Sequence, residues 1–311
     1  MKDARKEKNM MTIREMEIAK MVAKMVGVDS SEVVIGEREK NNGVMVKCVT
    51  VQRKESGYAS PVVYVDDLFR DLDNGKIGLK QAAVMIEERL IADGEAFESK
   101  CDLKLDAESL LDRCFVTIVG TEKNRKRLAD VPHIDICDMS VQVRANVEIN
   151  GKEGTFVVTN RIAEMHGVSN EELLDRALKN TLDTARFRCR DMRTLFIEDF
   201  GMPDRNGSFD PDPEPDENAL YVVTNDNGMY GASVLAYPDL IDEYARKIGG
   251  DVYILPSSVH EVIMVRKRLD VSLEGLRDLV KFVNGTELRP EDVLTDTVYE
   301  YTVGSKEVRV A

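Results

Sequence analysis

The chain has no tryptophan, and aromatic residues make up only 6% of its 311 residues, so few side chains could stack on nucleic-acid bases. It also lacks long apolar runs, since a run such as residues 252–255 is far shorter than the roughly 20 residues that span a membrane. The charged N-terminal residues do not lead into the apolar segment of a secretory signal. We therefore expect no membrane association and no export.

Cysteine is scarce and unpatterned, because the five cysteines are odd in number and include no Cys-x-x-Cys pair. They are Cys48, Cys101, Cys114, Cys137 and Cys189. This spacing argues against a disulfide framework and favours the reducing cytoplasm. The net charge of -14 repels phosphate backbones, so we expect a protein partner and no nucleic acid.

The sequence lacks several motifs that identify a class of reaction or cofactor. The sequence has no Walker loop, no Gly-x-Gly-x-x-Gly at a strand-helix junction, no His-Glu-x-x-His and no EF-hand loop. We therefore predict no cofactor.

The periodicity of the apolar residues predicts helices and antiparallel hairpins. Helical spacing covers residues 12–26 and ends at a glycine, and β-branched runs flank the turn at residues 41–43. Residues 141–149 alternate strictly and meet residues 155–158 through Asn-Gly, which suits a type I′ turn. We predict an α+β fold of mixed antiparallel sheets and hairpins with packed helices.

One acidic, proline-rich segment interrupts these patterns. Residues 210–217 read Asp-Pro-Asp-Pro-Glu-Pro-Asp-Glu, in which the prolines block regular structure and the like charges extend the chain. We therefore predict two lobes, an N-terminal α+β domain over residues 10–200 and a C-terminal α+β domain over 219–311, joined by a linker over 201–218.

Particular phrases along the chain resemble a known family. Three of them are Tyr-Val-Val-Thr-Asn at residues 221–225, Gly-Ala-Ser-Val-Leu at 231–235, and Tyr-Ile-Leu-Pro-Ser-Ser-Val-His-Glu at 253–261. Ser-Pro-Val-Val-Tyr-Val-Asp-Asp at 60–67 extends the pattern into the N-terminal half. With these phrases the chain resembles, over nearly its whole length, the Domain of Unknown Function family "fifty-six eighty-eight". The resemblance implies a bacterial protein of gut anaerobes and their mobile elements, and it implies no reaction or catalytic residue.

The phrase that ends at residue 261 contains Ser257, Ser258, His260 and Glu261, which are the residue types of a hydrolase relay. Side chains of adjacent strand residues point to opposite faces, so His260 and Glu261 would diverge. We favour a structural role, in which the serines shape a turn and His260 is hydrogen-bonded near the sheet edge.

A second group contains metal-ligand types, His133, Asp135, Cys137 and Asp138. Strand alternation would place His133, Asp135 and Cys137 on one face. The set is chemically mixed and is accompanied by no paired histidine or cysteine motif, so we predict no metal site.

A third group is basic. Helical spacing over residues 182–200 would align Arg186, Arg190 and Arg193, whose guanidinium groups can clamp anions. The alternative is a solvated face, or a face that pairs with the acidic segment 210–217 of the same chain. We favour this alternative because the net charge opposes polyanions.

Two functions remain open from the sequence. We favour a non-catalytic cytoplasmic interaction or regulatory module, and the alternative is a hydrolase-like enzyme that uses the Ser/His/Glu cluster. A contact between His260 and a hydroxyl or thiol inside a pocket would favour the enzyme.

Overall fold

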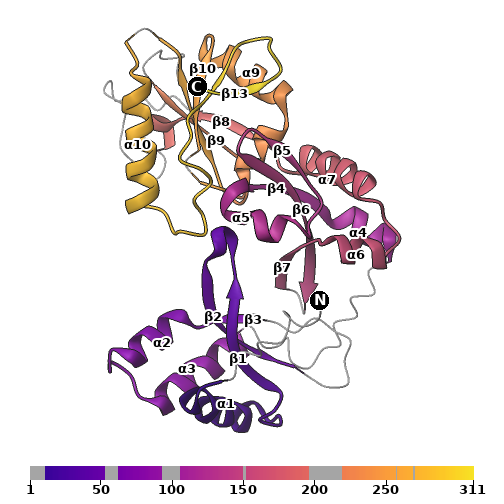
Figure 1. The fold of residues 1–311 in the computed structure, drawn as a ribbon, viewed down its shortest axis with the longest axis vertical. Coiled ribbons are helices and arrows are strands. Elements are labelled where there is room, and N and C mark those ends of the chain that lie inside the picture. The colour runs from indigo at the N-terminus through magenta and orange to yellow at the C-terminus, as the bar shows by residue number, and fades with distance from the viewer. Residues whose placement is uncertain are drawn as a thin grey trace, which may run out of the picture. The chain divides into compact units, whose positions relative to one another are not determined.

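The computed structural model describes residues 11–52, 62–92, 106–149, 152–195, 219–256, 258–268 and 270–311. The predicted α+β class is confirmed, since the described residues form three antiparallel sheets with helices packed against them (Figure 1). The chain divides into two compact units, unit 1 with Met1–Lys104 and Val147–Gly154, and unit 2 with Leu105–Asn146 and Thr155–Ala311.

Unit 1 is a three-stranded sheet, in the order β1-β2-β3, with three helices. Its elements are α1 (Ile13–Val26), β1 (Val33–Glu39), the turn η1 (Asn41–Gly43), β2 (Met45–Val51), β3 (Val62–Tyr64), α2 (Asp66–Asp73) and α3 (Leu79–Ala92). Figure 1 shows the helices gathered at one end of the long β1–β2 hairpin. Both the predicted helix over residues 12–26 and the predicted hairpin are confirmed.

Helix α1 begins with a capping box formed by Thr12 and Glu15. The side chain of Thr12 accepts a hydrogen bond from the backbone N–H of Glu15, and the Glu15 side chain accepts one in return from the Thr12 backbone. The other carboxylate oxygen of Glu15 lies 2.6 Å from Lys47 Nζ on β2. The same carboxylate therefore caps the helix and ties it to the sheet.

Unit 2 contains a six-stranded sheet in the order β13-β12-β10-β11-β9-β8, and a smaller sheet in which β6 pairs with β4, β5 and β7. Its helices are α4 (Ala107–Arg113), α5 (Thr121–Leu128), α6 (Asn160–Met165), α7 (Asn170–Thr184), η3 (Gly231–Ala236), α9 (Pro238–Ile248) and α10 (Leu273–Thr286). Its strands are β4 (Cys114–Gly120), β5 (His133–Ile136), β8 (Arg188–Asp191), β9 (Leu220–Thr224), β10 (Val252–Leu255), β11 (Val262–Arg266), β12 (Tyr299–Tyr301) and β13 (Val308–Val310). It also contains most of β6 (Met139–Ile149) and the end of β7 (Lys152–Val157), whose residues 147–149 and 152–154 are assigned to unit 1.

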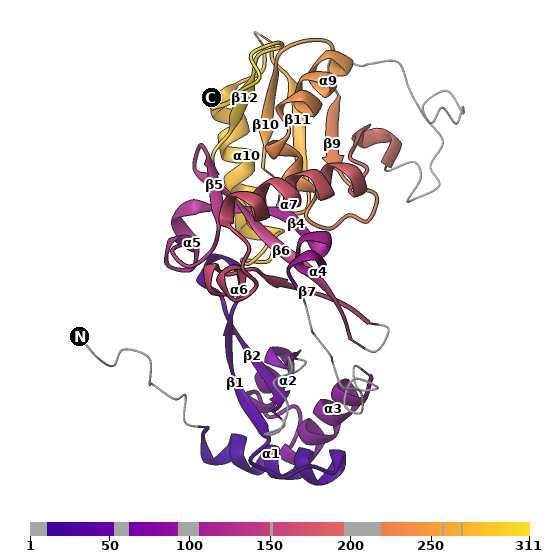
Figure 2. The ribbon, with the colours of Figure 1, turned by 90° about the vertical axis from the view of Figure 1, so that its right-hand side faces the viewer.

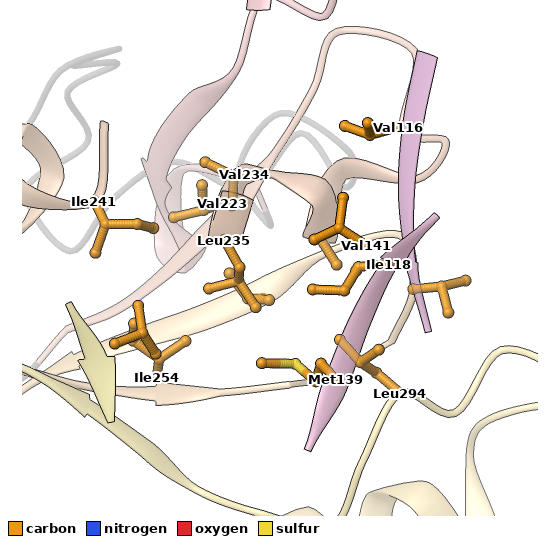
Figure 3. Close-up of a cluster of buried hydrophobic side chains, with 14 of the residues drawn as sticks. Val116, Ile118, Met139, Val141, Val223, Val234, Leu235, Ile241, Ile254 and Leu294 are labelled. Atoms are coloured by element: carbon orange, nitrogen blue, oxygen red, sulfur yellow. The ribbon is translucent and has the colours of Figure 1, made fainter. Parts of the chain in front are cut away.

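The two sheets of unit 2 share one hydrophobic core. Figure 3 shows Ile118 and Val141 from the smaller sheet close to Val223 and Ile254 from the larger one, with Leu235 of η3 between them. Figure 2 shows α7 running alongside β4. The opposite face of the larger sheet packs against α10 through a smaller cluster that includes Tyr253 and Val280.

The predicted division at residues 201–218 differs from the observed one. Strand β8 precedes that segment and β9 follows it, yet the two pair in register from Arg188↔Thr224 to Asp191↔Tyr221. The segment itself lies outside the described residues. Its composition predicted a linker, but composition carries no information about which strands pair across a segment.

The end of β4 lies against main chain, which gives a sharp packing test. A Cβ added to Gly120 would stand 2.4 Å from the carbonyl oxygen of Leu294, which cannot rotate away because it belongs to the backbone. We expect Gly120→Ala to lower the unfolding free energy by about 1–3 kcal/mol in urea titrations.

Gly285 of α10 is the matched control, because apart from its chain neighbours and the backbone of its own helix no atom lies within 4 Å of a Cβ added there. Gly285→Ala should leave stability unchanged or raise it by about 0.5–1 kcal/mol, since alanine is the better helix former. Equal effects of the two substitutions would contradict the packing at Gly120.

Candidate functional site

The segment between β10 and β11 contains the predicted Ser/His/Glu group. Ser257 lies outside the described residues. Ser258 is only 4% exposed, and its hydroxyl oxygen accepts a hydrogen bond from the backbone N–H of His260 at 3.0 Å. The Ser258 backbone N–H donates to the Glu261 carbonyl at 3.2 Å, which closes the turn. The side chain of Ser258 therefore shapes the local backbone, while the same prediction for Ser257 lies outside the described residues.

The imidazole of His260 has two partners, and neither is a serine. Its Nδ1 accepts a hydrogen bond from the backbone N–H of Tyr230 at 3.2 Å, and its Nε2 lies 3.5 Å from Asp292 Oδ1. The neutral tautomer with the proton on Nε2 satisfies both contacts. Among the described residues, therefore, His260 is not arranged as the base of a Ser/His/Glu relay.

Tyr230 is held in an unusual backbone conformation, with φ of 59°. Asn225 supports the loop before it, because its side chain accepts from the Met229 N–H at 3.1 Å and donates to the Met229 carbonyl at 2.7 Å. On the other side, the Ser233 hydroxyl donates to the Tyr230 carbonyl at 2.7 Å. A left-handed conformation is costly for a tyrosine, so these contacts stabilise a strained position.

The next residue must be glycine. A Cβ on Gly231 would lie 2.4 Å from Thr224 Oγ1 and 2.5 Å from the His260 carbonyl oxygen. The Thr224 hydroxyl donates to that same carbonyl at 2.8 Å. The loop therefore reaches the His260 turn only because residue 231 has no side chain.

The ring of Tyr230 joins a cluster of side chains from distant parts of the sequence. Its centroid lies 6.0 Å from that of Phe115 and 5.7 Å from that of His260, and Arg144 Cζ lies 5.4 Å from it. Phe115 and Arg144 face each other across β4 and β6. We call these four residues the Tyr230 cluster. All of them belong to unit 2 and are partly exposed.

Sequence reasoning missed Tyr230, Arg144 and Asp292. No local pattern marked them, because the contacts among them depend on the tertiary fold. The Tyr-Gly pair at residues 230–231 was the only local hint, since glycine marks places where the backbone must approach another segment closely.

An apolar pocket of about 50 Å³ lies where α10 meets the six-stranded sheet. Its lining residues are Leu220, Leu255, Pro256, Ile263, Leu279, Val280, Val283 and Asn284. Although Pro256 belongs to the β10–β11 segment, Ser258, His260 and Glu261 do not line this pocket. The described residues that line it therefore offer no acid, base or nucleophile to a substrate.

The residues considered as metal ligands are used locally. The ring of His133 contacts the Val131 carbonyl at 2.8 Å through Nδ1, and Asp135 accepts from the Ser140 hydroxyl at 2.6 Å. Cys137 lies in the turn after β5 with φ of 55°, so the predicted strand alternation does not extend to it. Within the described part of the chain, no three His, Cys, Asp or Glu residues are placed to hold a metal ion.

Asp138, next to Cys137, binds hydroxyl groups. Thr295 and Thr297 donate to its Oδ2 at 2.9 and 2.7 Å, and Tyr299 donates to Oδ1. Burial acts to raise the pKa of Asp138, but the three hydroxyl donors outweigh it and hold the pKa below its usual range. The carboxylate therefore fastens the segment before β12 to the β5–β6 turn.

The predicted helical face of arginines is wrong. Helix α7 ends at Thr184, Arg186 has a left-handed φ of 47°, and Arg190 lies in β8. The alternation of Phe187, Cys189 and Asp191 is the strand signal, and the arginine spacing concealed it.

The arginines around β8 instead pair with acids of unit 2. Arg188 lies 2.5 Å and Arg186 4.0 Å from Asp226, and Arg193 forms an ion pair with Asp191. The acidic segment 210–217, which we considered as a cover for these arginines, lies outside the described residues.

This geometry defines an α+β protein of two compact units, in which an aromatic and arginine cluster surrounds a histidine with architectural contacts. The chain belongs to the family of unknown function DUF5688, which matches residues 15–303, so the predicted resemblance is confirmed. Neither the comparison with curated proteins nor that with solved structures gave a match. Among the described helices, none combines the length and the apolar character needed to cross a membrane.

The contacts of Asp138 predict a pH dependence. A lowered pKa in the folded state stabilises the protein above the unfolded pKa of about 3.9, and this contribution is lost as pH falls through the folded pKa. We expect Asp138→Asn to lower the unfolding free energy by only about 0.5–1 kcal/mol at neutral pH, because Asp138 is partly exposed to solvent, and by progressively less below about pH 4.

Urea titrations of both proteins across this pH range provide the measurement. Tyr299→Phe, which removes one of the three hydroxyl donors, should show a smaller change of the same sign. If the difference between wild type and Asp138→Asn does not change with pH, the carboxylate is not the binding group.

Proposed function

We propose that this protein is a non-catalytic interaction or regulatory module. The observation that carries the proposal is the engagement of His260, whose ring nitrogens face the Tyr230 backbone and Asp292, while the Ser258 hydroxyl accepts from the backbone. A general base must be within hydrogen-bond reach of the proton that it takes from a nucleophile. These contacts support an architectural histidine.

The buried thiols are poor substitutes for a serine nucleophile. Burial raises the pKa of Cys114 to about 11 and that of Cys189 to about 12, so little thiolate forms near neutral pH. Among the described residues, the hydrolase alternative thus has no specific geometric observation in its favour.

The Tyr230 cluster is the surface that we propose for the partner. Tyrosine, phenylalanine, methionine and arginine are the residues enriched at the centres of protein interfaces. Met229, which precedes Tyr230 in the sequence, is 48% exposed, so we include it in the proposed surface. The bonds of Asn225 and Ser233 hold the loop in place, so binding would cost little ordering of the backbone.

We place this activity in the bacterial cytoplasm, in keeping with five cysteines whose spacing shows no disulfide pattern. The net charge of -14 supports a protein partner over a nucleic acid. An association with mobile elements rests on the family resemblance alone.

Photocrosslinking tests the proposed surface. A photoreactive amino acid replaces Met229 in one strain and Leu182 of α7 in another, because both side chains are 48% exposed. We expect the same cellular protein to be crosslinked repeatedly from position 229 and not from position 182, as read by mass spectrometry.

The second substitution Tyr230→Asn should abolish this crosslink, since asparagine tolerates the left-handed conformation but removes the ring. Equal crosslinking from the two positions, or crosslinking unchanged by Tyr230→Asn, would reject the cluster as the interaction surface.

A further inference from the structure

Arg144 of the Tyr230 cluster is held in place by uncharged groups. Its Nε and Nη2 donate to the Thr155 hydroxyl at 3.1 and 2.8 Å, and Nη2 also reaches the Thr155 carbonyl at 3.3 Å. The ring of Tyr230 lies beside the guanidinium, with Cζ 5.4 Å from its centroid. These contacts fix the orientation of the guanidinium without neutralising its charge.

No carboxylate among the side chains that the structure describes forms an ion pair with Arg144. This is notable in a chain where 57 acidic residues outnumber 43 lysines and arginines, and where Arg188 and Arg193 both have acidic partners. A guanidinium has five N–H groups, and the two on Nη1 have no acceptor among the side chains and backbone groups that the structure describes. Arg144 therefore presents an oriented, charged donor pair at the edge of the cluster.

The side chains around Arg144 limit which kind of anion could accept hydrogen bonds from its guanidinium. Phe115 and Tyr230 supply an apolar border beside the guanidinium, and this border suits a small anion attached to an apolar group. A polyanion would meet the repulsion of the whole chain, whereas a single carboxylate meets much less of it. An Asp or Glu side chain beside an apolar residue of a protein partner has both features.

We propose that Arg144 binds a carboxylate of a protein partner, while an apolar neighbour of that carboxylate packs on Phe115 and Tyr230. This inference rests on the proposed function, because it names the chemistry that the interaction surface recognises. Thr155 is a positioning residue, since it acts only through Arg144.

Hydrocinnamate, a carboxylate on a short phenylalkyl chain, is the probe. It is titrated into the full-length protein while NMR follows the side-chain Nε–H of Arg144 and the ring protons of Tyr230. We expect saturable shifts, with affinity at least about tenfold higher than for the neutral hydrocinnamamide. Phenyl phosphate, the arm that separates carboxylate from phosphate recognition, should bind no more tightly than hydrocinnamate.

Substitutions assign the effect to Arg144. Arg144→Met should lower hydrocinnamate affinity about tenfold or more, while Arg188→Met, which removes an arginine already paired with Asp226, should leave it unchanged. If Arg144→Met does not fold, Thr155→Val provides the second test, because it frees the guanidinium and should weaken binding while its charge remains.

Equal affinity for the acid and the amide, or unchanged binding by Arg144→Met, would overturn the inference. Tighter binding of phenyl phosphate by more than about tenfold would overturn the choice of a carboxylate. The two proposals fail separately: crosslinking from position 229 without hydrocinnamate binding rejects only the carboxylate site, and hydrocinnamate binding without crosslinking rejects the interaction module.

Discussion

The contact between the loop at residues 230–231 and the turn at His260 organises the proposed surface of unit 2. The His260 carbonyl accepts from Thr224, and the His260 ring accepts from the Tyr230 backbone. Both bonds require Gly231, since a side chain there would overlap Thr224 and His260. Because the loop is fixed in this way, the ring of Tyr230 lies beside residues of β4 and β6. These strands belong to the smaller sheet, whereas the His260 turn joins two strands of the six-stranded sheet.

Carboxylates fasten the C-terminal elements in a similar way. Asp138 accepts hydroxyl groups from the segment that leads into β12. Asp242 of α9 accepts from the Gly304 backbone at 2.6 Å and the Tyr301 hydroxyl at 2.9 Å. The Gly304 N–H, Arg246 and Tyr301 together lower the pKa of Asp242 to about 2, so it stays ionised over the whole range in which most proteins are folded. Negative charge, abundant in this chain, is thus used here to order backbone and hydroxyl groups.

The local elements were predictable where one sequence period dominated. The helix at residues 12–26 and the strands at residues 141–158 have clear helical or alternating patterns, and both are present. The helix predicted over residues 182–200 was wrong because the arginines have helical spacing. The alternation of Cys189 and Asp191 is instead the pattern of strand β8, which lies in the larger sheet. The observed division of the chain differs from the predicted one for a related reason, since strand pairing between β8 and β9 is not encoded locally.

Candidate residues were harder to interpret than elements. Ser258 and His260 were found by residue type, and their architectural use agrees with the interpretation that we favoured from turn chemistry. The partners Tyr230 and Asp292 lie 30 or more residues away in sequence, so no spacing rule could connect them to His260. Arg144 becomes a candidate binding residue only when its neighbours in the folded chain are known, because the groups that hold its guanidinium are uncharged.

The position of β12 affects how unit 2 folds during synthesis. Tyr299 and Tyr301 are almost completely buried in the shared core of unit 2, and β12 pairs with both β10 and β13. During synthesis from the N-terminus, that core stays incomplete until β12 and β13 have left the ribosome. At typical elongation rates the roughly 200 residues of unit 2 take on the order of ten to forty seconds, during which its apolar strands lack their final partner. The helices and the three-stranded sheet of unit 1 emerge first. The unfinished sheets of unit 2 would then depend on chaperones to keep their strands from pairing wrongly.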